Sequence, residues 1–347
     1  MPAGPPGRLA PRDGVTCGSR WYVVGAVIAA DGVSRPAAWS STDGRRWQSI
    51  PVAPHTYYGR LNVLYTAACR GDVLAAVGGR PGGAHGNPRV SSWYTRDDGT
   101  LEEVLAGFEL FGGPTAVNVG RLGAGPKGWL IVGNRTSGAA VWTSQHPTEF
   151  RILEGRPELA NDSRGEPWAF DLTPTTDGWL VVGGIVRTGR IDRDPMAWTS
   201  TDGSTWRRTS APATDEYEEL QRVTVAGGVP VAVGLRGSTF GAWRDDRGTW
   251  RPVARFGSTQ GGRGVAAVRS LRVAGRDLLA VTSDGSAHTL WISDLAGRSW
   301  QRVNTPVPMP SSVDRSATLT GTDRQLLLLT DDGRTGRGWL ADARTGR

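Results

Sequence analysis

The chain has 347 residues, of which 49 are glycine, 22 are proline and 15 are tryptophan, and its formal net charge is +7. No long stretch keeps a helical period, so a helical bundle is excluded and one large β architecture is favoured. The positive charge is dispersed among acidic residues and the longest apolar run, Trp21–Ala30, is too short to cross a bilayer. We therefore expect neither nucleic-acid binding nor a membrane span.

The predicted elements repeat one pattern along the chain. A tryptophan opens a short strand, an Asp-Gly turn follows, and a second large residue closes the turn. Trp39–Trp47 and Trp198–Trp206 are the clearest copies, and both enclose Ser-Thr-Asp-Gly. The opening residue recurs at intervals of 45 to 56 positions, 50 on average, at Trp39, Trp93, Trp142, Trp198, Trp243, Trp291 and Trp339. That spacing is typical of one four-stranded propeller blade.

A second element lies upstream of each opening tryptophan. It is a run of four or five apolar residues, often ending in glycine, as in Trp21–Gly25, Trp129–Gly133 and Trp179–Gly183. Such runs are typical of strands that are covered on both faces. We predict an all-β fold, a seven-bladed β-propeller of four-stranded antiparallel blades. It forms a single domain over residues 1–347, with blades at about 9–50, 57–104, 114–153, 166–209, 219–253, 264–303 and 315–347.

The Asp-Gly turns have a structural explanation. Asp43 and Asp202 are placed to accept hydrogen bonds from backbone N–H groups within their own turns. Gly44 and Gly203 tolerate a positive φ. We therefore expect these carboxylates to stabilise the hairpins rather than to act in catalysis.

The motif Ser-x-Asp-Gly-x-x-Trp resembles the Asp-box (BNR) repeat, and the resemblance covers nearly the whole chain. It implies a propeller with a fold like that of sialidases. Families with this repeat include sialidases, other glycan-active propellers, sortilin-like receptors and a photosystem-assembly propeller. Gly178–Gly184, followed by Trp198–Trp206, looks most similar to the last, non-enzymatic kind.

The residues that an active sialidase requires are not matched. Arg8–Pro11 is one residue too long for the Arg-Ile-Pro-type motif, and Asp215–Glu219, which contains the pair Glu216–Tyr217, is interpreted as a solvated charge run. The four histidines are scattered singly, and no nucleotide-binding loop or metal-ligand spacing occurs. We predict no catalytic residue, metal or cofactor, although the paired carboxylates of a glycosidase need no sequence spacing and stay an alternative.

Candidate binding residues follow from aligning the seven apolar strands. Eight positions before Trp179 and its equivalents lie Asp13, Thr66, Arg121, Asp171, Arg222, Ser270 and Thr318, all on the expected innermost strands. Arg121, Asp171 and Arg222, on successive blades, would suit an acidic or sugar-like ligand in the central channel. The alternative is that these charges neutralise one another and only line the channel.

A second candidate is the long insertion in the fourth blade, Gly184–Pro195. Arg187, Arg190 and Arg193 alternate there with Asp192 and Asp194. Long loops on a rigid scaffold often carry function, and a solvated hairpin is the equal alternative.

Two further features bear on location. Cys17 and Cys69 precede equivalent strands of neighbouring blades, so they form either a disulfide or two buried thiols. The seventh copy of the repeat has no room for its closing strand, and Met1–Arg8 is a poor strand because of its prolines. Either the seventh blade has three strands, or the natural protein has further N-terminal residues, such as a leader or anchor.

These features predict a non-catalytic, monomeric propeller that binds a protein partner or a carbohydrate. We expect it to be extracytoplasmic, secreted or surface-anchored, with a cytoplasmic location as the alternative. A glycan-acting hydrolase with carboxylates at the channel mouth is the alternative function.

Overall fold

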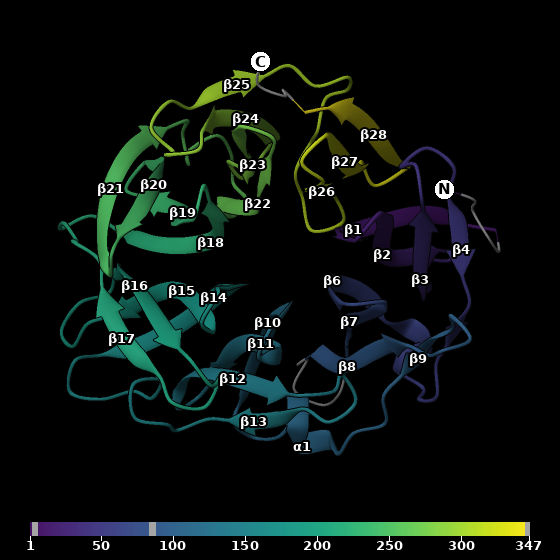
Figure 1. Ribbon diagram of the computed structural model, residues 1–347, viewed down its shortest axis with the longest axis horizontal. Coiled ribbons are helices and arrows are strands. Elements are labelled where there is room, and N and C mark those ends of the chain that lie inside the picture. Colours follow the sequence, from purple (N-terminus) through teal and green to yellow (C-terminus); the bar gives the residue numbers. More distant parts are fainter. Residues whose placement is uncertain (2–5, 83–87, 344–347) are drawn as a thin grey trace.

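The computed structural model describes residues 1, 6–82 and 88–343 and confirms the seven-bladed β-propeller (Figure 1). One strand of each sheet lies nearest the central axis. These innermost strands are β1 (Arg8–Cys17), β6 (Val63–Arg70), β10 (Ala116–Gly125), β14 (Glu166–Pro174), β18 (Glu218–Ala226), β22 (Ala267–Ala274) and β26 (Ser316–Gly321).

The two middle strands of each blade are the predicted apolar strand and the strand that contains the opening tryptophan. The second strands are β2 (Arg20–Ile28), β7 (Val73–Pro81), β11 (Gly128–Arg135), β15 (Trp179–Val186), β19 (Val229–Arg236), β23 (Asp277–Ser283) and β27 (Gln325–Asp331). The third strands are β3 (Ser34–Ser41), β8 (Pro88–Thr95), β12 (Gly138–Ser144), β16 (Arg193–Ser200), β20 (Thr239–Asp246), β24 (His288–Asp294) and β28 (Gly336–Asp342).

The outermost strands are mostly short. They are β4 (Gln48–Ile50), β9 (Leu101–Glu103), β13 (Arg151–Leu153), β17 (Arg207–Ser210), β21 (Thr249–Phe256) and β25 (Gln301–Val303). The helical segments are the 3-10 turn Gly59–Leu61 and α1 (Phe108–Phe111).

Two blades depart from the predicted four antiparallel strands. The second has five, because β5 (Val52–Ala53) of the chain leaving blade one pairs in parallel with β9. Within the described residues the seventh blade has three strands, β26–β27–β28.

Every junction of the ring has its own apolar core. Seven clusters of buried side chains each combine residues from two neighbouring blades. The cluster that joins blades one and seven contains Trp21, Trp39 and Leu327. Hydrophobic packing thus closes the ring at the same kind of interface that holds the other six junctions.

The Asp-Gly turns have the predicted chemistry. Oδ1 of Asp202 accepts the N–H groups of Ser204 and Thr205, both at 2.7 Å. Ser200 Oγ donates to the same oxygen at 3.0 Å, and Gly203 has a φ of 75°. The backbone N–H bonds are the main cause that lowers the pKa of Asp202 to about 2. These contacts indicate that the repeated motif stabilises the hairpin turn between the third and the outermost strand.

The glycines that end the apolar runs lie within the second strands and have a role that the sequence did not reveal. Each lies opposite a β-bulge in the innermost strand, as Gly183 lies opposite Ala169, where the register shifts between Ala169 and Asp171. A Cβ at Gly183 would meet the carbonyl oxygen of Trp168 at 1.8 Å. Glycine is required at Gly183 because the backbone of β14 comes too close there to admit a side chain.

Replacing Gly183 by alanine should therefore be strongly destabilising. We expect G183A to lower the free energy of unfolding by about 2 kcal/mol or more, since backbone must move to admit the methyl group. Gly107→Ala is the matched control, because nothing lies within 4 Å of a Cβ at that position. Urea unfolding measures both, and equal midpoints for the two variants would contradict this explanation.

Cys17 and Cys69 form a disulfide between β1 and β6, which decides the question that the sequence left open. The bond links residues 52 positions apart and joins two neighbouring blades. We expect the double variant C17S/C69S to lose about 2–5 kcal/mol of stability, since the unfolded chain gains entropy without the cross-link. Thermal unfolding with and without reductant measures this, and a reductant-insensitive melting temperature would be evidence against the bond.

Candidate functional site

The seven residues expected to face the central channel belong to equivalent strands of the seven blades. All seven are on the innermost strands, one from each blade, and six of the strands have a β-bulge at this level. All of the uncharged and acidic members are buried: Asp13, Thr66, Asp171, Ser270 and Thr318.

Four of these buried side chains join neighbouring blades. Asp171 Oδ2 accepts the backbone N–H of Val223 in the next blade at 3.0 Å, and Asp13 Oδ2 accepts that of Ala67 at 3.1 Å. Thr66 Oγ1 and Ser270 Oγ accept the corresponding N–H groups at 3.3 and 3.2 Å. Each acceptor satisfies a backbone donor of the neighbouring innermost strand, whose edge toward the axis has no ladder partner among the described strands.

Arg121 and Arg222 occupy the same ring but cannot accept hydrogen bonds. Both donate to the carbonyl oxygen of Arg269, from Nη2 of Arg121 at 3.0 Å and from Nε of Arg222 at 3.1 Å. Arg121 also forms an ion pair with Asp13 at 3.1 Å. The expected trio is thus divided: Asp171 bonds backbone, while the two arginines converge on a third residue.

The channel carries an excess of positive charge. Burial, and then the neighbouring Arg121, lower the pKa of Arg222 to about 9. Burial and Arg121 also lower the pKa of Arg269, whose side chain has no hydrogen bond or ion pair with any described residue. The sequence analysis did not identify Arg269, because this residue is the extra residue of a bulge and lies one position before the expected ring residue of its strand.

The arginines of the blade-four insertion are paired rather than free. Arg187 bonds Asp194, and Arg190 bonds Asp192 and lies 3.6 Å from Asp194. The insertion is a compact hairpin between β15 and β16, cross-linked by its own charges.

Arg193 reaches out of that hairpin into blade five. Its Nη1 donates to Tyr217 Oη at 2.6 Å and to Glu219 Oε2 at 2.8 Å, and its guanidinium lies over the ring of Trp168. Burial, and then the charge of Glu219, raise the pKa of Tyr217. The prediction that the side chains of Asp215–Glu219 are solvated is therefore wrong for Glu219, which is buried beside Arg193.

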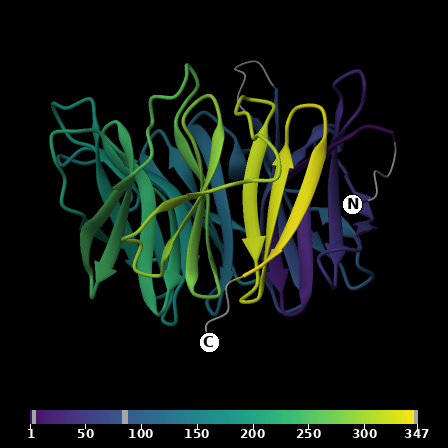
Figure 2. The same ribbon diagram turned by 90° about the horizontal axis from the view of Figure 1, so that it is seen from above.

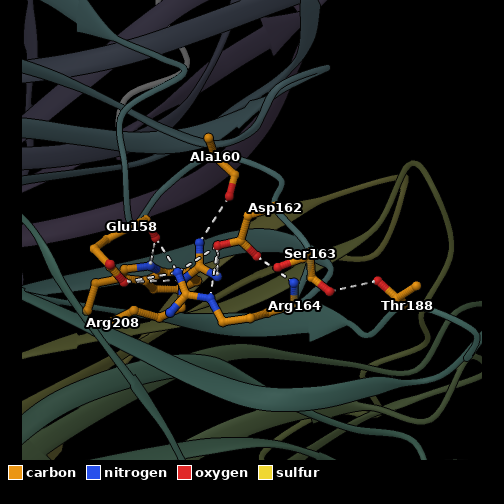
Figure 3. Close-up of polar contacts among 8 residues, drawn as sticks. Glu158, Ala160, Asp162, Ser163, Arg164, Thr188 and Arg208 are labelled. Carbon is orange, nitrogen blue, oxygen red and sulfur yellow. Dashed lines mark hydrogen bonds and ion pairs between the residues drawn. The ribbon is translucent and has the colours of Figure 1, made fainter.

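The loop from blade three to blade four is anchored in a similar way (Figure 3). Arg208 in β17 donates to the carbonyl oxygens of Glu158 at 2.9 Å and Ala160 at 3.0 Å, and to Asp162 at 3.3 Å. Arg164 bonds the same carboxylate at 2.6 Å. Buried arginines thus hold connecting loops in fixed conformations.

These loops all belong to one face of the ring. The connections between blades and between second and third strands emerge at that face, shown at the top in Figure 2. We call it the loop face; the Asp-Gly turns lie on the opposite face. The exposed large apolar side chains of the described residues all belong to loop-face segments: Val33, Tyr57, Leu105, Phe108, Ile191, Val265 and Val313.

Two classes of site lack support in the described part of the chain. No group of three or more His, Cys, Asp or Glu side chains is arranged to hold a metal ion there. None of the helices in residues 1, 6–82 and 88–343 is long and apolar enough to span a bilayer.

The fold and these contacts define the class: a seven-bladed β-propeller with clustered arginines on its innermost strands and a loop-rich face. No known protein family and no curated protein matches the sequence. Similar solved structures include YCF48 bound to D1 peptide, with 15% identity, 98% of this chain and 95% of that chain covered, and a TM-score of 0.56.

Enzymes of similar fold are also found. The ulvan lyase of polysaccharide lyase family PL25 has 12% identity, 97% and 94% coverage of this chain and of that one, and a TM-score of 0.58. The periplasmic gluconolactonase PpgL of Pseudomonas aeruginosa has 15% identity, 86% coverage of each chain and a TM-score of 0.56. At these identities the comparisons establish the fold, and both binding proteins and enzymes share it.

The contact between Asp171 and Val223 predicts a structural cost on mutation. We expect D171A to lose about 1–3 kcal/mol of stability, since a buried backbone N–H loses its acceptor. D171N should recover most of the loss because an amide oxygen can accept the same bond. Urea unfolding of the three proteins measures this, and full stability of D171A would mean that Asp171 is not needed at the junction.

Proposed function

We propose that this protein is a non-catalytic binding propeller that holds a protein partner against its loop face. The observation that carries the proposal is that the exposed large apolar side chains of the described residues all lie on that face and none lies on the opposite one. A surface that exposes apolar side chains, while the opposite surface exposes none, is a candidate interaction site. The hairpin that presents Ile191 is held by the Arg187–Asp194 and Arg190–Asp192 pairs, so it has little conformational entropy to lose on binding.

The charge of the channel favours an acidic partner. Arg121, Arg222 and Arg269 meet there with Asp13 as the carboxylate that pairs with Arg121. Excess positive charge attracts acidic groups and raises association rates. Arg121, Asp171 and Arg222 stay the predicted ligand-binding trio, with Asp171 acting through the blade junction. The peptide bound by YCF48, a propeller of the same fold, supports the choice of a protein over a glycan.

We place the protein outside the cytoplasm and assign its turns to the Asp-box type. A cross-linking disulfide persists in oxidising compartments, and Cys17–Cys69 is such a bond. The Ser200–Asp202 turn, with its backbone N–H bonds to the carboxylate, supports the Asp-box assignment.

A matched pair of surface variants tests the binding face. The loop-face variant carries four aspartates in place of exposed apolar residues: Leu105, Ile191, Val265 and Val313. The control variant carries four aspartates on the opposite face, at Thr42, Gln145, Ser204 and Ser299, so that both change the net charge equally.

We expect proteins captured from a cell-envelope extract by the wild type to be retained by the control and lost, by about 10-fold or more, by the loop-face variant. Quantitative mass spectrometry of the captured proteins measures this. Equal capture by both variants would refute a loop-face site. Turnover in a parallel assay for released reducing sugar would favour the glycan hydrolase instead.

A further inference from the structure

One arginine on the loop side of blade two forms no ion pair within the described part of the chain. The Arg89 guanidinium lies over the ring of Phe108, 4.5 Å from its centroid, and 5.5 Å from that of Tyr58. Its Nε is buried without a hydrogen-bond acceptor, and Arg89 forms no ion pair with any described residue. A guanidinium has five N–H donors, so the stacking leaves its hydrogen-bonding capacity unused.

Arg89 lines a small pocket between the connection that precedes blade two and the connection that follows it. The pocket has a volume of about 190 Å³, and its walls include Thr56, Tyr58, Arg89, Ser91 and Phe108. Three of the exposed apolar residues of the loop face are in the same two connections: Tyr57 is 69%, Leu105 69% and Phe108 60% exposed. The pocket therefore combines an uncompensated cation with an apolar rim.

A buried carboxylate fixes the first wall. Oε2 of Glu103 accepts the N–H groups of His55 at 2.7 Å and Thr56 at 2.8 Å. Oε1 accepts the hydroxyls of Thr56 and Ser91, both at 2.7 Å. Glu103 is 2% exposed and its oxygens are fully engaged, so it positions the connection instead of neutralising Arg89.

A buried arginine fixes the second wall. Arg135 in β11 donates to the carbonyl oxygens of Gly112 at 2.5 Å and Glu109 at 2.8 Å, at the two ends of α1. Trp142 Nε1 donates to the Leu110 carbonyl at 2.6 Å. Phe108 is thus held rigidly although its ring is exposed, which is the property expected of a preorganised binding anchor.

We propose that this pocket receives a segment of a protein partner in which a carboxylate side chain adjoins a large apolar side chain. The carboxylate would accept two parallel N–H bonds from Arg89, and the apolar side chain would pack on Phe108 and Leu105. Arg–carboxylate pairs of this geometry are strong and directional, and aromatic and arginine side chains dominate interface energetics. The inference rests on the proposed protein-binding function and names the anchor within it.

An array of capped octapeptides tests the proposal with the intact protein. The peptides carry Asp, Glu, Asn, Gln or phosphoserine at one central position and Leu, Phe, Ser or Gly beside it. We expect the wild type to retain peptides that combine Asp or Glu with Leu or Phe, and the Asn and Gln counterparts to bind about 10-fold more weakly or worse.

Five variants locate the binding. R89Q and F108A should each reduce the affinity of the retained peptides about 10-fold or more. R89K should keep only part of the affinity, because lysine has the positive charge of arginine but lacks its planar pair of N–H donors. S204A and S299A, which truncate exposed side chains in the Asp-Gly turns of the opposite face, should bind as the wild type does. Thermal melting of each variant verifies that it is folded.

The remaining outcomes separate this inference from the proposed function. Acid-dependent binding that is unchanged in R89Q would overturn the Arg89 site while a protein-binding propeller stands. A preference for phosphoserine over Asp and Glu would replace the carboxylate partner by a phosphopeptide and overturn the stated chemistry. Retention of no peptide by the wild type would overturn the inference, and the extract experiment above then decides the proposed function on its own.

Discussion

A ring of seven sheets holds its shape only if the first sheet meets the last. In the described residues no strand is shared between blades one and seven, so side chains make that contact. Trp21 and Trp39 pack against Leu327, and the buried Asp331 accepts hydrogen bonds from Arg8 and from Arg12, the latter at 2.8 Å. The negative charge of this buried carboxylate is neutralised by the two arginines. The junction thus combines hydrophobic packing with directional, charged hydrogen bonds.

The closed ring explains why function is assigned to loops. Its innermost strands are occupied with holding the blades together, through acceptors such as Asp171 and Ser270 that bond the neighbouring backbone. The connections at the loop face do not hold blades together in this way. Buried charged side chains such as those of Glu103 and Arg208 nevertheless keep these connections rigid. Rigid scaffolds with functional loops are a common division of labour, and here the polar core of each loop maintains it.

Much of the fold could be predicted from the spacing of the tryptophans. Trp39 and its six counterparts fixed the number of blades, and Asp202 fixed the chemistry of the turns, because both depend on local sequence. The channel was predicted less completely. Counting along aligned strands located Asp171 and Arg222, but it assumed regular strands, and the bulges add a residue that no pattern of polarity marks. Arg269 was missed for that reason.

The pocket lined by Arg89 could not be predicted from the sequence, for a different reason. Arg89, Tyr58 and Phe108 come from three segments whose proximity depends on how two connections are folded. The buried contacts of Glu103 and Arg135 determine that folding, and a charged residue in a sequence is expected at the surface. Tertiary contacts, rather than local pattern, place this site.

Hydrogen-exchange mass spectrometry of the intact protein, with and without the best peptide from the array, tests the central claim most directly. We expect slower amide hydrogen exchange in segments 55–62 and 104–113, which form the pocket, and unchanged exchange in the Asp-Gly turns of the opposite face. Protection confined to those turns, or to the outer strands, would contradict a binding site on the loop face.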